Sequence, residues 1–200
     1  MDSKNILLIV LLFAAVTSGF VFKSDLFSAF INYGYNSTHK VYALRLPDTL
    51  RFAGESFPIT SPDLKERLDR ELLVNTYWQS NMMLLLKRSN KFFPIIERVL
   101  KKEGVPIDFK YLAVIESGLE NVRSPAGAKG FWQIMSTTGR DYGLEINSNV
   151  DERYHLEFST KVAAKYLKKA KVKFGSWALA AAAYNRGMNG IQRNLTAQKA

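Results

Sequence analysis

Helix start and stop signals recur along the chain from Ser61 onward, and they constrain the fold more than any other feature. Ser61 and Pro62 favour a helix start, because a serine side chain accepts from free amides and proline suits the first helical position. Leucines at 64, 68 and 72 follow at helical spacing, so we expect a helix to about Gln79. No convincing strand pattern follows residue 60. The sequence therefore predicts an all-α fold.

Four further segments continue this helical pattern. An amphipathic segment around 95–100 ends at Gly104, and a short helical stretch covers 131–143. A long basic helix is expected over about 156–174, and an alanine-rich helix follows its predicted cap, Ser176. The lysines of the basic helix, at 161, 165, 168, 169, 171 and 173, are expected to form an ordinary solvated face. We assign Trp78 and Trp177 to packing.

The N-terminal part of the chain has a different character. An uncharged apolar run from Ile6 to Phe22 precedes Lys23, and its length lies between that of a signal-peptide core and that of a membrane span. We expect residues 1–24 to be a signal peptide or a membrane anchor, and we favour a retained anchor. Residues 25–60 are dense in Gly, Pro, Ser and Asn, which predicts a linker with one strand or turn. Residues 61–200 then form one domain.

Composition excludes several kinds of site. The chain has no cysteine, which excludes disulfides, thiolate metal ligands and cysteine nucleophiles. With only two histidines and no nucleotide-binding fingerprint, we expect neither a metal nor an organic cofactor. The formal net charge of +10 suits nucleic acid, a membrane surface or an acidic polysaccharide as partner. Nucleic acid is disfavoured, because no recognisable nucleic-acid-binding motif accompanies the basic helix.

The stretch YLAVIESGLEN, residues 111–121, places a glutamate where an apolar residue would fit. If Asp108 caps a helix that begins at Phe109, then Leu112, Ala113 and Glu116 lie on one face. The other face is also apolar, with Tyr111, Val114 and Ile115, and a helix that is apolar nearly all round is predicted to be buried.

Glu116 is therefore expected to have a raised pKa. Burial favours the neutral carboxyl, and Gly118, the predicted stop, places Glu116 at the negative end of the helix dipole. A carboxyl shifted in this way can donate a proton to a leaving group near neutral pH. The alternative is a structural glutamate that pairs with a lysine or arginine.

Three separated segments decide between these interpretations: ESGLEN at 116–121, SPAGAKGFWQIM at 124–135 and AAYNRG at 182–187. Together and in this order they resemble the lytic transglycosylases, a family that shares the lysozyme-like (goose-type) fold. The resemblance covers roughly three quarters of the chain. It implies an enzyme that cleaves peptidoglycan glycan strands on the periplasmic side of the cell envelope. It also implies that such a domain normally continues with further helices beyond the position of Ala200.

The resemblance assigns roles to individual residues. Glu116 is the catalytic acid and then the base, and Ser117 is the serine beside it. Ser124, Gln133, Tyr184 and Asn185 would line the site and hold the sugar, with the tyrosine hydroxyl near the glutamate, where it can form a hydrogen bond. The alternatives are a core tyrosine with a satisfied hydroxyl for Tyr184 and a loop-bracing amide for Gln133. Gly127, Gly130 and Gly187 are expected to serve the backbone. Phe131 and Trp132 stand where many members have Leu-Met, which leaves the shape of the sugar subsite open.

The chemistry is consistent with a single carboxylate. Ordinary glycosidases need two, whereas a substrate that supplies its own nucleophile needs one. The resemblance implies attack by the 2-acetamido oxygen of N-acetylmuramic acid, followed by closure of a 1,6-anhydro ring. Two alternatives stay open: a lysozyme-type hydrolase that holds water with Asp141, Glu145, Asp151 or another acid, and an inactive, membrane-tethered glycan-binding protein.

Overall fold

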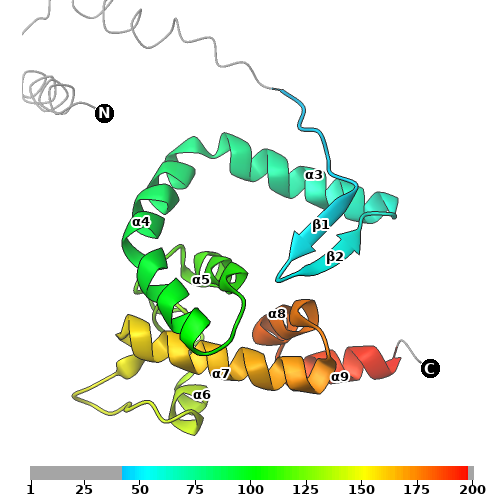
Figure 1. Ribbon diagram of the computed structural model, residues 1–200. Coiled ribbons are helices and arrows are strands. Elements are labelled where there is room, and N and C mark those ends of the chain that lie inside the picture. The colour runs from blue at the N-terminus through cyan, green and yellow to red at the C-terminus, as the bar shows by residue number, and fades with distance from the viewer. Residues whose placement is uncertain (1–41, 198–200) are drawn as a thin grey trace, which may run out of the picture. The chain divides into compact units, whose positions relative to one another are not determined.

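The computed structural model describes residues 42–197, which are mainly helical (Figure 1). The expected signal peptide or anchor lies outside the described residues. Within them, no helix is both long and apolar enough to cross a membrane. The elements are β1 (Thr49–Phe52), β2 (Glu55–Pro58), α3 (Pro62–Tyr77), α4 (Gln79–Lys102), a 3-10 turn (Ile107–Phe109), α5 (Lys110–Ser117), α6 (Ser136–Asp141), a second 3-10 turn (Glu152–Tyr154), α7 (Leu156–Phe174), α8 (Trp177–Arg186) and α9 (Met188–Ala197).

Local capping signals determine the helix boundaries, as the sequence predicts. The Ser61 side chain accepts from the amide of Leu64 at the start of α3. Ser176 caps α8 in the same way, through the amide of Leu179. Helix α7 has the predicted bounds and ends at Gly175, whose φ of 76° suits glycine. Between residues 61 and 197, strand-like pairing is confined to isolated bridges.

The range expected to be a linker contains an antiparallel hairpin of β1 and β2. Ala53 and Gly54 both have positive φ, as a two-residue hairpin turn of type I′ requires. The hairpin packs on the helices, because the Phe52 ring meets Phe109 edge-on at 5.1 Å. The prediction of one strand or turn therefore underestimated the regular structure here.

Glu55 of the hairpin binds the N-terminus of α8. Its carboxylate accepts from the Ser176 hydroxyl at 2.6 Å and from the amides of Trp177 at 2.6 Å and Ala178 at 3.0 Å, and it pairs with Lys171 at 3.0 Å. These hydrogen bonds, the one from Ser176 foremost, lower the pKa of Glu55 to about 2. A carboxylate at a helix N-terminus also complements the helix dipole. The hairpin thus stabilises the start of α8.

We expect Glu55→Gln to lower the melting temperature at pH 7, because a neutral amide loses the ion pair and most of the amide contacts. Since folding lowers the pKa from 4.5 to about 2, the stabilisation by Glu55 is complete above pH 4.5 and is lost as the pH falls through 2. Thermal unfolding followed by circular dichroism from pH 7 to pH 2 measures the difference. Glu66→Gln on exposed α3 is the control, and equal melting temperatures at pH 7 would contradict the prediction.

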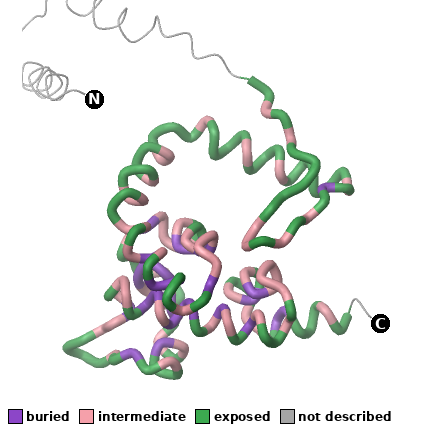
Figure 2. The backbone as a smooth tube through the Cα atoms, viewed as in Figure 1, coloured by how far each residue is buried: buried purple, intermediate pink, exposed green. Residues whose placement is uncertain are grey.

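The core lies where the end of α4 meets α5, α7 and α8 (Figure 2). Its largest fully buried side chains are Trp132, Phe109, Ile96, Leu100, Leu119 and Leu167. Helix α3, in contrast, has no buried residue. Trp177 packs against Phe109, as predicted, but the prediction for Trp78 was wrong, because this residue is 56% exposed between α3 and α4.

Candidate active site

Helix α5 carries Glu116 and begins later than the sequence indicated. Residues 107–109 form a 3-10 turn, and Phe109 precedes α5 without a side-chain cap. Asp108 is not the cap, because its carboxylate accepts from the amide of Ala53 in the hairpin at 2.7 Å. The helix ends at Gly118 with φ 61°, as predicted.

Only one face of α5 is buried. Leu112 and Ala113 lie in the core, and Glu116 on the same face is half-buried. Tyr111 and Ile115 are 51% and 77% exposed, so the prediction that the helix is buried all round was wrong. A residue-by-residue count of apolar side chains could not show that just one side of α5 faces the core.

The Glu116 carboxyl has no charged neighbour to hold it ionised. Among residues 42–197, no ion pair or hydrogen bond includes its side chain. Burial raises the pKa of Glu116 above its ordinary value of 4.5. Both observations match the predicted proton donor, and the alternative of a structural ion pair has no partner in the described part of the chain.

The neighbouring carboxylate, Glu120, has a charged partner. It forms an ion pair with Arg88 of α4, whose guanidinium also donates to the carbonyl of Gly118 at 3.1 Å. Arg88 therefore binds both the C-terminal end of α5 and the Glu120 carboxylate, which lies beyond the glycine that ends the helix. The two glutamates of ESGLEN thus have different environments.

The three motifs meet at the backbone of Phe131 and Trp132. The Ser117 hydroxyl lies 2.9 Å from the Phe131 carbonyl and 3.1 Å from that of Ala113, and it donates to these acceptors. The Tyr184 hydroxyl donates to the Trp132 carbonyl at 2.8 Å. One side chain from the first motif and one from the third thus fix adjacent peptides of the second. Segments far apart in sequence are brought together as predicted.

Tyr184 does not bond Glu116, contrary to expectation, because its hydroxyl is used by Trp132. The two residues still interact electrostatically. Burial first, and then the charges of Glu116 and Tyr166, raise the pKa of Tyr184 well above its usual value. Tyr184 therefore stays neutral and contributes a rigid wall beside the glutamate.

Phe131 and Trp132 are core residues. Trp132 is fully buried and its indole donates to the Thr160 hydroxyl of α7 at 2.8 Å. Phe131 meets Phe92 of α4 at a centroid distance of 4.7 Å. The Phe-Trp pair therefore fills space between α4 and α7.

Two of the predicted polar site residues brace their own loop. The Ser124 hydroxyl accepts from the amide of Ala128 at 3.0 Å. The Gln133 side-chain amide donates to the carbonyls of Gly130 at 2.8 Å and Val122 at 3.2 Å. Gln133 itself has φ 44°, an uncommon conformation for a non-glycine residue. Its carbonyl oxygen remains for other contacts.

The sequence analysis did not identify Arg153, whose buried side chain binds carbonyl groups of this loop. Its side chain is 4% exposed, pairs with Asp151 at 2.7 Å and donates to the carbonyls of Gly127 and Ile134. Gly130 packs directly on the Arg153 backbone, with φ 78°, and a Cβ there would overlap the Arg153 carbonyl group. The charged run DERYH gave no signal of burial.

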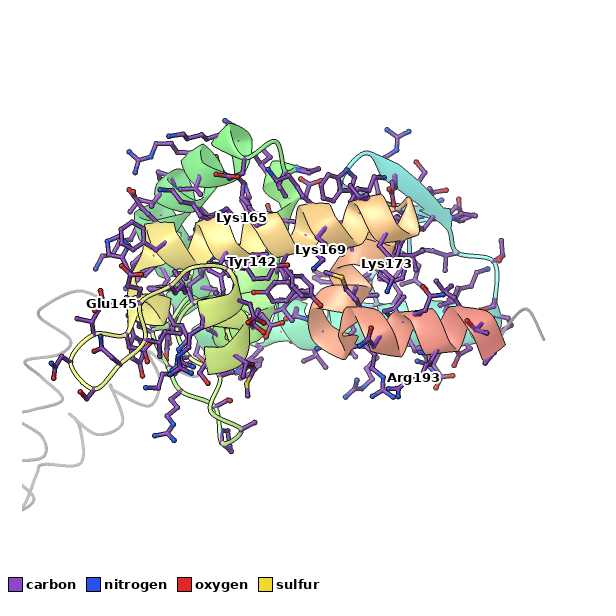
Figure 3. The ribbon with its side chains drawn as sticks, turned by 90° about the horizontal axis from the view of Figure 1, so that it is seen from below. Tyr142, Glu145, Lys165, Lys169, Lys173 and Arg193 are labelled. Atoms are coloured by element: carbon purple, nitrogen blue, oxygen red, sulfur yellow. The ribbon has the colours of Figure 1, made fainter. Side chains whose placement is uncertain are left out.

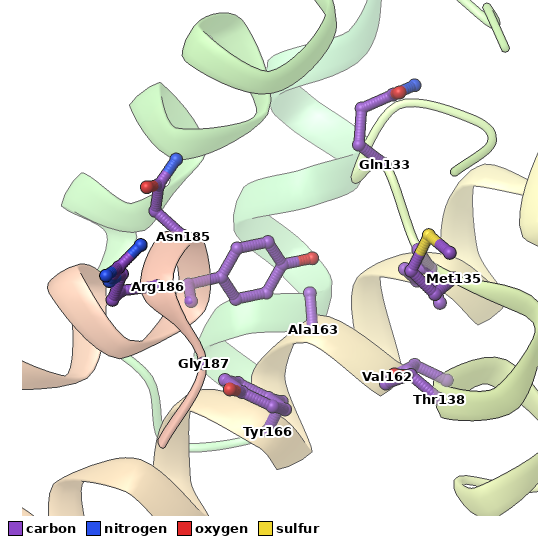
Figure 4. Close-up of a pocket in the computed structure, with 11 residues that line it drawn as sticks. Gln133, Met135, Thr138, Val162, Ala163, Tyr166, Asn185, Arg186 and Gly187 are labelled. Carbon is purple, nitrogen blue, oxygen red and sulfur yellow. The ribbon is translucent and has the colours of Figure 1, made fainter. Parts of the chain in front are cut away.

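A cavity of about 260 Å³ opens between the second and third motifs (Figure 4). Gln133 and Met135 line one side, Asn185 and Arg186 the opposite side, and Tyr166 the base, and Tyr184 also belongs to the lining. The lining does not include Glu116, Ser117 or Ser124. The structure therefore brings Gln133, Tyr184 and Asn185 around one space, whereas Glu116 does not line it and interacts only electrostatically with Tyr184.

The acids proposed for a water-activating role have other environments. Asp151 pairs with Arg153 and Lys129, and the Arg153 hydrogen bond foremost lowers its pKa well below the usual range. Glu145 is exposed and accepts from Asn147 at 2.7 Å. Asp141 lines a hollow that adjoins this cavity and shares Tyr166 with it. No aspartate or glutamate lines the cavity with Gln133 and Asn185.

The histidine and acidic side chains within residues 42–197 do not indicate a metal site. The His155 ring accepts from the amide of Phe158 and caps α7. Within residues 42–197, no group of three or more histidine, aspartate or glutamate side chains could hold a metal ion. His39 lies outside this range.

The half-buried Glu116 and the three motifs that meet beside it can be compared with known protein families. The family model described as the transglycosylase SLT domain matches residues 93–200, so the chain belongs to this family. The match begins in α4 and includes all three motifs.

Two curated relatives are both named membrane-bound lytic murein transglycosylase D. They come from Escherichia coli strain K12 and Escherichia coli O6:H1 (strain CFT073). Each is 28% identical over 158 residues, which cover 76% of this chain and 34% of the relative. The chain thus spans about a third of the length of these relatives.

Proposed function

We propose that this protein is a peptidoglycan lytic transglycosylase that uses Glu116 as its single acid and base. The observation that carries the proposal is the state of Glu116: half-buried, with a pKa raised by burial and no ion pair within residues 42–197. Membership of the transglycosylase SLT domain family supports it. We propose further that the helices form a lysozyme-like domain at the cell envelope, anchored through residues 6–22.

In the proposed reaction, the neutral Glu116 carboxyl protonates the glycosidic oxygen between N-acetylmuramic acid and N-acetylglucosamine. The 2-acetamido oxygen of the muramyl residue attacks its own anomeric carbon as that bond breaks. The Glu116 carboxylate then removes the proton from the 6-hydroxyl, and this oxygen displaces the acetamido oxygen. The product is a 1,6-anhydro ring, Glu116 is again protonated, and no water is consumed.

The surrounding residues would position the sugar rather than exchange protons. Gln133 and Asn185 present amide groups on opposite sides of the cavity, where they can hold sugar hydroxyl or acetamido groups (Figure 4). Ser117 and Tyr184 fix the Phe131–Trp132 peptides between the glutamate and this cavity. Ser124 is proposed to keep the loop in shape for binding.

Digestion of purified peptidoglycan in H₂¹⁸O, followed by mass spectrometry, tests the reaction. We expect 1,6-anhydromuramyl ends without ¹⁸O, because the 6-hydroxyl closes the ring. Reducing ends that carry ¹⁸O would overturn the proposal and identify a lysozyme-type hydrolase. Such an enzyme would need a second acid to hold water, and Asp141 and Glu145 are then the first residues to replace.

A further inference from the structure

The lysines of α7 divide into two groups. Lys168 pairs with Glu103 and Lys171 with Glu55, both on the side that faces α4 and the hairpin. The others, at 161, 165, 169 and 173, recur every four residues along one face, and Figure 3 shows Lys165, Lys169 and Lys173 in a row. The expectation of one ordinary solvated face was therefore too simple.

None of these four lysines forms an ion pair within residues 42–197. Like charges at four-residue spacing destabilise a helix. A row of lysines without carboxylate partners therefore lowers the stability of α7, which suggests that these charges serve a ligand.

A hollow of about 370 Å³ lies beside this row, between α6, α7 and α9. We call it the basic hollow, and its lining includes Lys169, Arg186 and Arg193, with Asp141 as its one carboxylate. Figure 3 shows Lys169 on α7 and Arg193 on the neighbouring α9, and both residues line the hollow. Neither arginine forms an ion pair among the described residues. Three cations against one carboxylate favour an anionic ligand.

Arg186 is positioned by its neighbour α9. Its aliphatic stem rests on Gly190, where a Cβ would lie 2.8 Å from the Arg186 Cγ. The glycine thus leaves room for the arginine to lie over α9 at the edge of the hollow. A guanidinium offers paired donors that match the two oxygens of a carboxylate.

The basic hollow continues the candidate sugar cavity. The two spaces share Thr138, Tyr166, Arg186 and Gly187 in their linings. Three tyrosine rings lie along the two spaces. The ring centroids of Tyr184 and Tyr166 are 5.4 Å apart, and those of Tyr166 and Tyr142 are 6.4 Å apart. A sugar bound beside Gln133 and Asn185 would therefore adjoin a space that is lined by Lys169 and Arg193.

We propose that the basic hollow binds the carboxylates of the stem peptide on the muramyl residue of the substrate. This inference rests on the proposed function. In peptidoglycan the peptide is attached to the lactyl group of that sugar, and each extended residue spans about 3.3–3.6 Å, so its carboxylates reach a space that adjoins the sugar cavity. The hollow would then make the enzyme prefer peptide-bearing strands to bare glycan.

The test compares cleavage of intact glycan strands with strands stripped of peptides by an amidase. We expect the double variant Lys169→Gln/Arg193→Gln to raise KM about tenfold on intact strands, or about 1.4 kcal/mol, with KM on stripped strands unchanged. Lys173→Gln is the matched control, because it removes an exposed charge of α7 that does not line the hollow, and it should change neither KM. Melting temperatures verify that the variants fold.

Other results would overturn the inference. If the double variant raises KM equally on both substrates, the hollow binds the glycan itself. If the double variant has the same KM as the wild type on both substrates, the hollow has no role in binding. Weaker binding of the double variant to vesicles with anionic phospholipids, at an unchanged ratio of KM values, assigns the cations to phosphate groups. If the wild type cleaves neither substrate, the proposed function has failed instead.

Discussion

Glu116→Gln is expected to reduce glycan cleavage by about 10²–10⁴-fold, the usual contribution of a positioned general acid. The amide keeps the shape of the side chain but has no proton to transfer. The rates are measured from the release of anhydromuramyl products. Glu120→Gln is the control, because Glu120 is the other glutamate of the motif and pairs with Arg88, and we expect this variant to retain cleavage.

The raised pKa of Glu116 adds a pH dependence to this prediction. Only the protonated enzyme can donate, so kcat/KM falls as the pH rises through the pKa of Glu116. The stability of the wild type changes in the same direction. Folding raises this pKa above 4.5, so the wild type loses stability as the pH rises through the folded-state pKa, whereas the glutamine variant does not.

Glu116→Gln should therefore melt at a higher temperature than the wild type at pH 8, and the difference should close as the pH falls below 4.5. Unchanged cleavage by this variant would sink the assignment of Glu116. Retained glycan binding accompanied by an inactive wild type would instead favour the glycan-binding protein without catalysis.

Gly130→Ala is expected to cause the second-largest loss. At φ 78° an alanine costs about 1–2 kcal/mol in backbone conformation. In addition, its Cβ would lie 2.9 Å from the carbonyl carbon of Arg153 and overlap the oxygen. Forcing this overlap costs about 1–3 kcal/mol more, and it displaces the loop that holds Gln133.

The control for Gly130→Ala is Gly127→Ala in the same loop. Gly127 has φ 89°, but a Cβ there meets nothing within 4 Å. We expect Gly127→Ala to lower the free energy of unfolding only by the cost of the backbone conformation. Gly130→Ala should lower it by this cost and by the cost of the overlap with Arg153, and it should also reduce cleavage. Urea unfolding of both variants measures the difference. Equal losses would show that the contact with Arg153 does not constrain the loop.

Helix caps and helix bounds that depend on short stretches of sequence were predictable. Caps at Ser61 and Ser176 and the bounds of α7 depend on neighbouring residues, and the structure confirms them. The convergence of the three motifs was predictable through resemblance alone. Helix α9 was missed, since Asn189, Gly190 and Asn194 are poor helix formers, and it is Ile191 that packs into the core.

Interactions between distant segments were not predictable. Nothing near Asp108 indicates that its carboxylate would bind Ala53, and nothing near Arg153 indicates that a guanidinium would be buried behind the motif loop. Trp78 was assigned to packing by residue type, although its place between two helices leaves it exposed. The polar contacts of Tyr184 depend on where the Trp132 carbonyl lies. Such contacts exist only once the chain has folded.

The hydrogen bond between Glu55 and Ser176 has a consequence for how this protein is assembled during synthesis. The two residues are separated by 121 positions, so the carboxylate leaves the ribosome long before the helix that it caps. Pairing across such a long loop is entropically slow and comes late in folding. The strand hairpin must therefore remain available until Ser176 emerges, and its contact with the start of α8 forms only in the last stage of folding.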